Sequence, residues 1–340
     1  MDSVGGAMNG TKFTDLPYEL ASKGDIRPSG THQVSQLPAS FPSHVESPML
    51  WKPADLAQKS DQWISYLGEE DVSAIEQSMD AFIASKADLQ TITPETFPLP
   101  QSLTAKLHSI SECCYNGLGF CILRGFPSSN ISQLEKAVLF GGVSAHVASE
   151  RGFQDIDRKH VLAHLFKRYA TSPGEYIPPS FDNTPLAFHT DDGDIVALYY
   201  PSFTEKGGKT QLASQPLIYN ELAMNRPDLL KVLADEWLID RYYRPDLPPR
   251  QVPLLHHYGE GDITIQYTRL PFSRYKGSRA PRPDIPPLTS EQIEALDALQ
   301  TLATKNSFPV PTQSGDILFF NNMGLFHGRE SYEEPGNAET

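Results

Sequence analysis

Two short histidine-containing segments lie 138 residues apart in this chain of 340 residues, and each adjoins a run typical of a β-strand. The first is Phe188-His189-Thr190-Asp191, and the second is Leu325-Phe326-His327-Gly328-Arg329. A turn and an apolar run, Gly315 to Asn321, precede the second segment. In a closed sheet this turn and run can lie beside the first segment. If the two segments meet, the strand-rich half of the chain has to close on itself as one domain.

The side chains of these segments match the ligand set of a metal site. Side chains two apart on a strand point to the same face, so His189 and Asp191 can converge on one ion while Thr190 points away. His327 supplies a third group. Two neutral imidazoles and one carboxylate suit Fe(II), and they leave coordination positions open for a bidentate cosubstrate and O2. The His-x-Asp tripeptide alone is weak evidence, because a chain with 10 histidines often has one beside a turn aspartate by chance.

The second half of the chain is a succession of short strand-like runs separated by turns rich in Pro and Gly. Only two helical stretches interrupt these runs, which favours a jelly roll over alternating strands and helices. Upstream, apolar residues recur at helical spacing from Val72 to Ile83 and from Leu103 to Cys114. We predict a mainly β fold, a distorted jelly roll (double-stranded β-helix) with flanking α-helices. The strand-like runs are Leu186 to Phe188, Asp194 to Tyr200, Asp262 to Tyr267 and Asp316 to Asn321.

The first 45 residues differ in composition from the rest. Residues 1–45 are rich in Gly, Ser, Thr and Pro and show little periodicity, so we predict a flexible N-terminal extension. Residues 46–340 are predicted to form a single domain that carries the chemistry.

Charge and composition exclude several classes of partner. The net charge is −14, and no stretch gathers the Lys and Arg needed to neutralise successive phosphates, so nucleic acid is not expected to bind. No apolar run approaches the roughly 20 residues of a membrane span, and the N-terminus lacks the features of a signal peptide. We therefore expect a cytoplasmic protein that does not enter membranes.

The three cysteines and the run from His160 to His164 are expected to be structural. Cys113, Cys114 and Cys121 have neither the number nor the spacing of a disulfide framework or a zinc site, so they are interpreted as core or helix residues. The spacing of His160 and His164 would put both imidazoles on one face of a helix, but no Glu follows the first histidine as in a zinc peptidase. We therefore interpret this run as a core strand and not as a metal site.

From about Ser40 to Glu334, the order of motifs resembles the taurine dioxygenase family of Fe(II)/2-oxoglutarate-dependent oxygenases, and in particular members from fungal metabolism. The resemblance implies that His189, Asp191 and His327 bind Fe(II), and that Thr210 hydrogen-bonds the carboxylate of the cosubstrate 2-oxoglutarate. O2 is the second cosubstrate. The matching segments are Trp63 to Leu67, Gly119 to Pro127, Phe188 to Asp191, Gly207 to Thr210, Gly315 to Asn322 and Phe326 to Arg329.

One feature of the family is missing from its usual place. Family members hold the distal carboxylate of 2-oxoglutarate with an arginine about one strand beyond the second histidine, but Tyr332 to Thr340 contains no Arg or Lys. We expect the natural chain to continue past Thr340. The alternatives within the chain are Arg329, on the same face as His327 if the strand continues, and Arg269 or Arg274.

The resemblance implies an enzyme that oxidises an unactivated C–H bond of a small acid, an amino acid or an intermediate of secondary metabolism. Hydroxylation, desaturation or ring closure would accompany release of succinate and CO2. Two alternatives stay open, namely a catalytically degenerate protein that binds a metabolite on the same fold, and a non-haem iron oxidase that does not use 2-oxoglutarate. The expected partner is a small-molecule substrate, and assembly into a homo-oligomer is left open.

Overall fold

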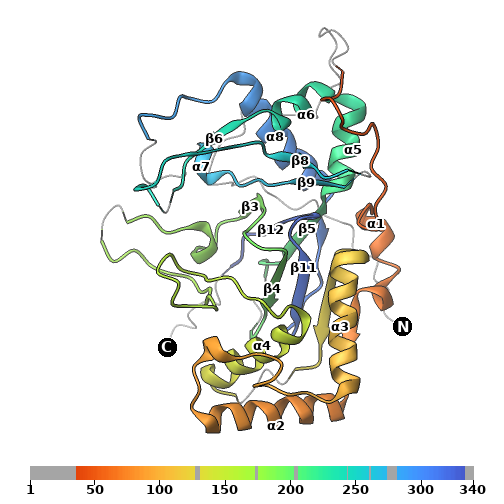
Figure 1. Ribbon diagram of the computed structural model, residues 1–340, viewed down its shortest axis with the longest axis vertical. Coiled ribbons are helices and arrows are strands. Elements are labelled where there is room, and N and C mark those ends of the chain that lie inside the picture. Colours follow the sequence, from red (N-terminus) through yellow and green to blue (C-terminus); the bar gives the residue numbers. More distant parts are fainter. Residues whose placement is uncertain are drawn as a thin grey trace.

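The computed structural model describes residues 36–126, 131–172, 175–202, 206–242, 244–259, 262–273 and 282–333 (Figure 1). Two four-stranded sheets form its centre. The first sheet has the order β1 (Ile64–Tyr66), β2 (Phe120–Arg124), β11 (Ile317–Asn321), β4 (Ile195–Tyr199), and only its β1–β2 pair is parallel. The second sheet has the order β10 (Phe308–Pro309), β5 (Thr210–Ser214), β12 (Leu325–Arg329), β3 (Leu186–His189), and every pair is antiparallel.

Alternation along the strands divides the core into three clusters of buried side chains. Along β11, Ile317 and Phe319 face one cluster while Leu318 and Phe320 face another. The cluster of Leu318 and Phe320 also contains Leu212 of β5, so it fills the space between the two sheets. Such interdigitation between two inner faces is what holds a sandwich of sheets together.

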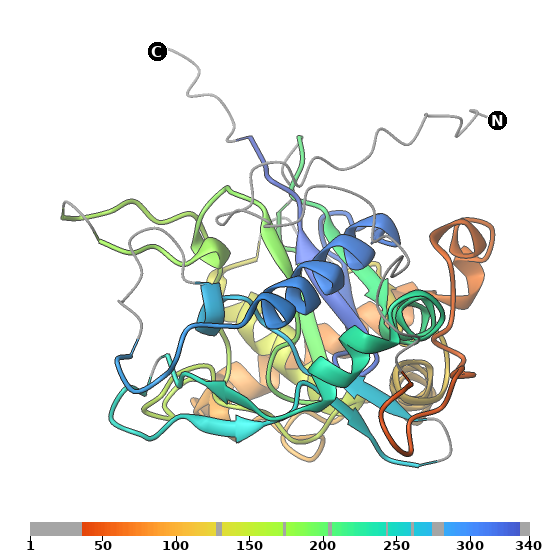
Figure 2. The ribbon, with the colours of Figure 1, turned by 90° about the horizontal axis from the view of Figure 1, so that it is seen from above.

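Helices cover both outer faces of this sandwich. The side chains of α2 (Glu69–Ser85), α3 (Gln101–Asn116) and α4 (Gln133–Val147) pack in the cluster outside the first sheet. Those of α5 (Gln215–Asn225), α6 (Pro227–Ala234) and α8 (Ser290–Lys305) pack in the cluster outside the second sheet. Figure 2 shows α8 lying across the strands of the second sheet. A reciprocal pair of cap hydrogen bonds between Thr289 and Gln292 begins α8.

The remaining elements are short. They are α1 (Pro53–Leu56), α7 (Leu270–Ser273), the 3₁₀ turns η2 (Ser60–Gln62), η3 (Leu89–Thr91) and η4 (Pro179–Phe181), and two hairpins. The hairpins pair β6 (Trp237–Ile239) with β7 (Arg250–Val252) and β8 (Leu255–His257) with β9 (Ile263–Ile265).

The balance of helix and strand differs from the mainly β prediction. Within the described ranges, four of the helices contain 15 to 17 residues each, whereas no strand exceeds five. The helices outside the sheets were expected as flanking elements, but they contain more of the described residues than the strands do. The architecture is therefore a mixed one, in which a sandwich of two sheets lies between two layers of helices.

Two local predictions meet different outcomes. The segment from His160 to His164 is no strand, and both histidines are exposed, so the prediction of a core strand there was wrong. The three cysteines are free, with Cys113 and Cys114 in α3 and Cys121 in β2, as interpreted from their spacing. Within the described residues, no helix is both long and apolar enough to cross a membrane.

Most of the predicted N-terminal extension, residues 1–35, lies outside the described residues. The described part, residues 36–45, contacts the layer of helices beside the second sheet. Val45 is buried, and its backbone N–H and C=O groups both bond to the side chain of Asn220, at 2.8 and 2.9 Å. The hydroxyl of Tyr219 donates to the carbonyl of Pro42.

Candidate metal centre

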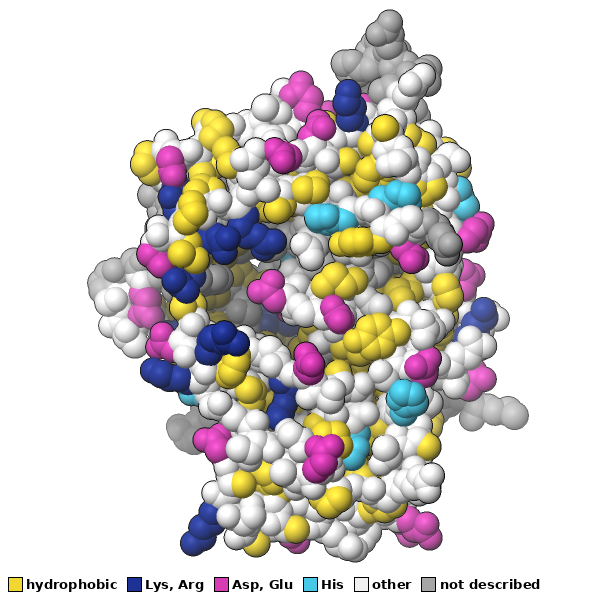
Figure 3. Space-filling model, viewed as in Figure 1, with side chains coloured by type: hydrophobic (Ala, Val, Ile, Leu, Met, Phe, Trp, Pro, Cys, Tyr) yellow, Lys and Arg dark blue, Asp and Glu magenta, His cyan; other side chains and the backbone are white. Residues whose placement is uncertain are grey.

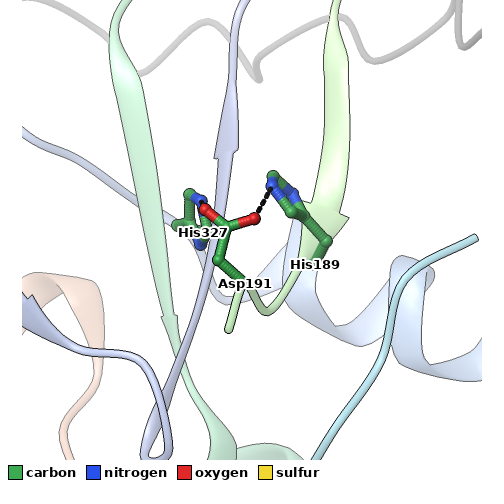
Figure 4. A group of neighbouring side chains, drawn as sticks. All are labelled: His189, Asp191 and His327. Carbon is green, nitrogen blue, oxygen red and sulfur yellow. Dashed lines mark ion pairs between the residues drawn. The ribbon is translucent and has the colours of Figure 1, made fainter. Parts of the chain in front are cut away.

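Two neighbouring strands carry the histidines of the candidate site. His189 ends β3, His327 lies in β12, and the two residues are direct partners in the antiparallel ladder. Their ring centroids are 4.0 Å apart. The carboxylate of Asp191, from the turn after β3, lies between them, 3.6 Å from Nε2 of His189 and 3.4 Å from Nε2 of His327 (Figure 4). One ligand atom from each of the three residues lies within 4.8 Å of the other two.

The turn that presents Asp191 is held from both sides. The amide N–H of Asp191 donates to Oδ1 of Asn322, and Nδ2 of Asn322 donates to the carbonyls of Asp191 and Gly193. Thr190 turns away from the site, since its N–H donates to the carbonyl of Tyr267 and its Oγ1 accepts from the N–H of Tyr267. These hydrogen bonds fix the backbone that carries the Asp191 side chain.

The surroundings of His189 fix its tautomer. Its Nδ1 lies 2.9 Å from the carbonyl oxygen of Ala187, which can only accept, so Nδ1 carries the proton. In the neutral ring, Nε2 then keeps its lone pair and faces Asp191. Burial and the neighbouring His327 lower the pKa of His189 to about 4, so the ring is neutral at physiological pH and need not lose a proton to bind a metal.

His327 is buried and packs against an aromatic ring. The ring of Phe320 lies 4.8 Å from it, between centroids. Its Nδ1 is buried and has no hydrogen-bond partner among the described residues. Packing and the Asp191 carboxylate therefore hold this ring.

The electrostatics of the group fit a bound cation. Burial alone would raise the pKa of Asp191, but a hydrogen bond from His327 and the two imidazoles hold that pKa well below its usual range. The carboxylate is therefore ionised at neutral pH. The Nε2 atoms of the two histidines and one anionic oxygen converge in this way, and once Nε2 of His327 releases its proton they form a donor set that a divalent metal can satisfy. The Asp191 side chain is half exposed, which leaves the site open on one flank.

The face of the molecule that is viewed in Figure 1 carries side chains of both charges. Figure 3 shows a hollow on the face viewed in Figure 1, with both basic and acidic side chains along its rim.

Thr210 lies on the same sheet, at the start of β5. Its partner across the ladder is Arg329, just as Leu212 is the partner of His327. Thr210 therefore lies two residues along β5 from the level of His327, on the same face. Its Oγ1 lies 2.7 Å from the hydroxyl of Tyr200, the residue that follows β4. Burial raises the pKa of Tyr200, so its hydroxyl stays protonated and can donate.

Arg329 has its terminal nitrogens occupied. They donate to the carbonyl oxygens of Pro179, Ser180, Asp182 and Thr184, which belong to η4 and the connection that leads into β3. These contacts fix the segment that leads to His189, and they favour a structural role for Arg329 over the role of a cosubstrate anchor. Of the other candidates, Arg269 forms a buried ion pair with Asp297 at 2.6 Å, and Arg274 lies outside the described residues.

A family comparison decides the classification of the chain. Residues 85–339 match the model of the taurine catabolism dioxygenase TauD, TfdA family. The chain belongs to this family. The resemblance seen in the sequence is thereby confirmed, and the chain is a non-haem Fe(II)/2-oxoglutarate-dependent oxygenase that uses O2.

Individual relatives agree with the family. The taurine hydroxylase-like protein SAT17 of Stachybotrys chartarum is 33% identical over 292 residues, which cover 84% of this chain and 74% of the relative. The FR-33289 synthase of Streptomyces rubellomurinus is 23% identical over 86% of each chain.

Solved structures share the fold at low identity. An asparagine oxygenase in complex with Fe(II), 3-hydroxyasparagine and succinate superposes with a TM-score of 0.61 at 14% identity, over 81% of this chain and 90% of that one. The non-haem iron oxygenase OrfP in complex with Fe and α-ketoglutaric acid gives a TM-score of 0.57 at 17% identity, over 81% and 89%.

Some residues that build the site were not predicted. Asn322 was part of a matching segment, but nothing in the sequence indicated that its side chain holds the Asp191 turn. Tyr200 and Phe320 are aromatic residues in apolar runs, and such residues are common throughout the core. Gln300 of α8, which bonds to β3, lies 112 residues from its partner, and no local pattern connects the two.

Proposed function

We propose that this oxygenase oxidises an unactivated C–H bond of an amino acid or a related small acid, with conversion of 2-oxoglutarate to succinate and CO2. The observation that carries the proposal is the convergence of three ligand atoms, from His189, Asp191 and His327, within 4.8 Å of one another. We propose these three residues as the ligands of Fe(II). O2 is the oxidant for C–H cleavage, and bound Fe(II) and 2-oxoglutarate would supply the electrons that activate it.

Each residue of the chain has a distinct task in this proposal. Asp191 supplies a negative charge, and His189 supplies a neutral nitrogen whose orientation the Ala187 carbonyl fixes. Phe320 excludes water from one side of His327. The hydroxyls of Thr210 and Tyr200 are 2.7 Å apart, so one hydroxyl hydrogen joins the pair and the other can be donated to a carboxylate of 2-oxoglutarate.

The substrate class rests on the relatives. The structural neighbours were crystallised with hydroxylated asparagine or hydroxylated arginine, and one sequence relative is named as a synthase of FR-33289. Amino acids and small acids are therefore the first compounds to test. Hydroxylation, desaturation and ring closure are all outcomes of hydrogen abstraction from such a substrate. We further propose that residues 46–340 act as one oxygenase domain, since β1 and β12 belong to the same sandwich.

Consumption of O2 and release of succinate test this proposal. The purified protein with Fe(II) is given 2-oxoglutarate and a panel of amino acids and small acids, and succinate is measured with and without each compound. We expect succinate release that depends on 2-oxoglutarate and rises with one member of the panel. O2 uptake that is independent of 2-oxoglutarate would instead identify an iron oxidase, and no uptake under any condition would identify a metabolite-binding protein.

A further inference from the structure

The strand that carries His189 is irregular where it pairs with β12. His327 pairs with His189, but Arg329 pairs with Leu186, so three steps along β3 match two steps along β12. One extra residue of β3 therefore bulges from the ladder. Such bulges re-aim side chains and often lie beside active sites.

The backbone of β12 comes close to this bulge because Gly328 has no side chain. A Cβ atom at Gly328 would lie 2.8 Å from the carbonyl oxygen of Leu186 and 3.4 Å from the amide nitrogen of Phe188. The bulge thus depends on close contact between the two backbones.

A residue of α8 satisfies the backbone group that the bulge displaces. The amide N–H of Phe188 donates to Oε1 of Gln300 at 3.0 Å. Gln300 is fully buried, and its Nε2 donates to Oγ1 of Thr304 at 3.2 Å. The bond to Phe188 crosses from the helical layer to the edge strand of the sheet.

The peptide unit held by Gln300 is the one that orients His189. Its N–H belongs to Phe188, and its C=O belongs to Ala187, whose oxygen accepts from Nδ1 of His189 at 2.9 Å. The two groups of one planar peptide unit point in opposite directions. When Gln300 fixes the N–H, it also fixes the direction of the carbonyl that holds the imidazole. Hydrogen bonds linked in this way also polarise and strengthen one another.

We propose that Gln300 is a positioning residue for the metal centre. Through the peptide unit between Ala187 and Phe188, it keeps the Nδ1–H tautomer of His189 and aims Nε2 toward Asp191 and His327. Gln300 acts in this way only if His189 binds the metal, as we propose. Outer partners of metal-binding histidines are known to matter in general, but Gln300 is one hydrogen bond farther out than such partners usually are.

Three variants distinguish the role of the Gln300 side chain as a hydrogen-bond acceptor from its contribution to the packing of α8. Gln300→Met has nearly the same shape but cannot accept from Phe188. Gln300→Glu keeps an acceptor oxygen but loses the donor to Thr304. Thr304→Val removes the acceptor of the hydrogen bond from Nε2 of Gln300 and leaves Oε1 of Gln300 in place. Circular dichroism checks that each variant is folded, and Gln300→Asn, whose shorter amide does not reach Phe188, replaces Gln300→Met if that variant does not fold.

Metal binding is measured without turnover. Co(II) is titrated into the metal-free protein under anaerobic conditions, with affinity from calorimetry and geometry from the ligand-field absorption bands. We expect about tenfold weaker binding and shifted bands for Gln300→Met. Gln300→Glu and Thr304→Val should remain close to the wild type. In the metal-free protein, NMR of ¹⁵N-labelled histidine should show faster exchange of the Nδ1 proton of His189 in Gln300→Met alone.

Two sets of outcomes distinguish this role from the metal assignment itself. If the wild type binds no Co(II), or if His189→Ala binds it as tightly as the wild type, the proposed metal centre is wrong. If the wild type binds and His189→Ala does not, unchanged affinity, bands and proton exchange in folded Gln300→Met overturn only the role of Gln300. An equal loss in Gln300→Glu or Thr304→Val also overturns it, because the acceptor would then not be the cause.

Discussion

The two sheets of the sandwich use strands of similar length, but they differ in regularity. In the first sheet, β11 pairs with β2 and with β4 residue by residue without a slip. In the second sheet, β12 pairs regularly with β5 but slips against β3, next to His189. The regular sheet has apolar clusters on both faces, whereas the irregular sheet presents His189, His327 and Thr210 on its inner face. Regular pairing serves stability, and the departure from it serves the site.

The largest effect is expected for the ligands of the irregular sheet. Asp191→Ala removes the anionic donor that lies between the two imidazoles, so succinate release should fall to background. Asp192→Ala removes an exposed carboxylate one residue away and serves as the control, which should keep activity near the wild type. Full activity in Asp191→Ala would remove Asp191 from the metal centre.

A core variant of the regular sheet should act on stability instead. Phe319→Ala in β11 leaves a cavity where a fully buried ring packs against the helices, which costs about 3–5 kcal/mol. Urea unfolding followed by circular dichroism measures this loss. The folded fraction should still bind one metal ion per chain with wild-type affinity. A weaker metal site at unchanged stability would show that the two sheets do not divide the tasks in this way.

Thr210 tests whether the inner face of the irregular sheet binds the cosubstrate. Thr210→Val keeps the shape of the side chain but removes the hydroxyl beside Tyr200. A hydrogen bond to a charged group contributes about 1.5–3 kcal/mol, so the KM for 2-oxoglutarate should rise roughly ten- to hundredfold. Thr210→Ser retains the hydroxyl and should restore most of the affinity. An unchanged KM in Thr210→Val would place the carboxylate elsewhere.

The smallest change in KM is expected for Arg329. Because its terminal nitrogens donate to the backbone between Pro179 and Thr184, Arg329→Met should loosen that connection while the KM for 2-oxoglutarate changes less than in Thr210→Val. Hydrogen exchange of residues 179–184 and steady-state kinetics measure the two effects. A larger rise in KM than in Thr210→Val would restore Arg329 as the cosubstrate anchor.

The regular parts of the fold were readable from the sequence because they depend on local patterns. Apolar runs of strand length predicted β4 and β11, and helical spacing predicted α2 and α3. The run from His160 to His164 misled because it is short, and three apolar residues between two histidines do not establish burial. The layers of helices outside the sheets were underestimated, since a helix count from sequence does not show how much of the core the helices cover.

The candidate site was readable only in part. Strand alternation indicated His189 and Asp191, and the position of His327 after the run from Gly315 to Asn321 indicated the third ligand. Thr210 followed only from the resemblance to the family. The bulge in β3 was not readable, since it depends on Gly328 and Gln300, which are distant in sequence from Phe188. The contacts of Arg329 could not be predicted either, because a strand pattern in the sequence does not show which loop contacts the end of that strand.

Anomalous diffraction at the iron edge tests the central claim most directly, with crystals of the whole chain grown anaerobically with Fe(II). We expect a single strong peak at about 2.0–2.2 Å from Nε2 of His189, a carboxylate oxygen of Asp191 and Nε2 of His327. A peak at another place in the molecule, or one that lacks any of these three ligands, would contradict the assignment.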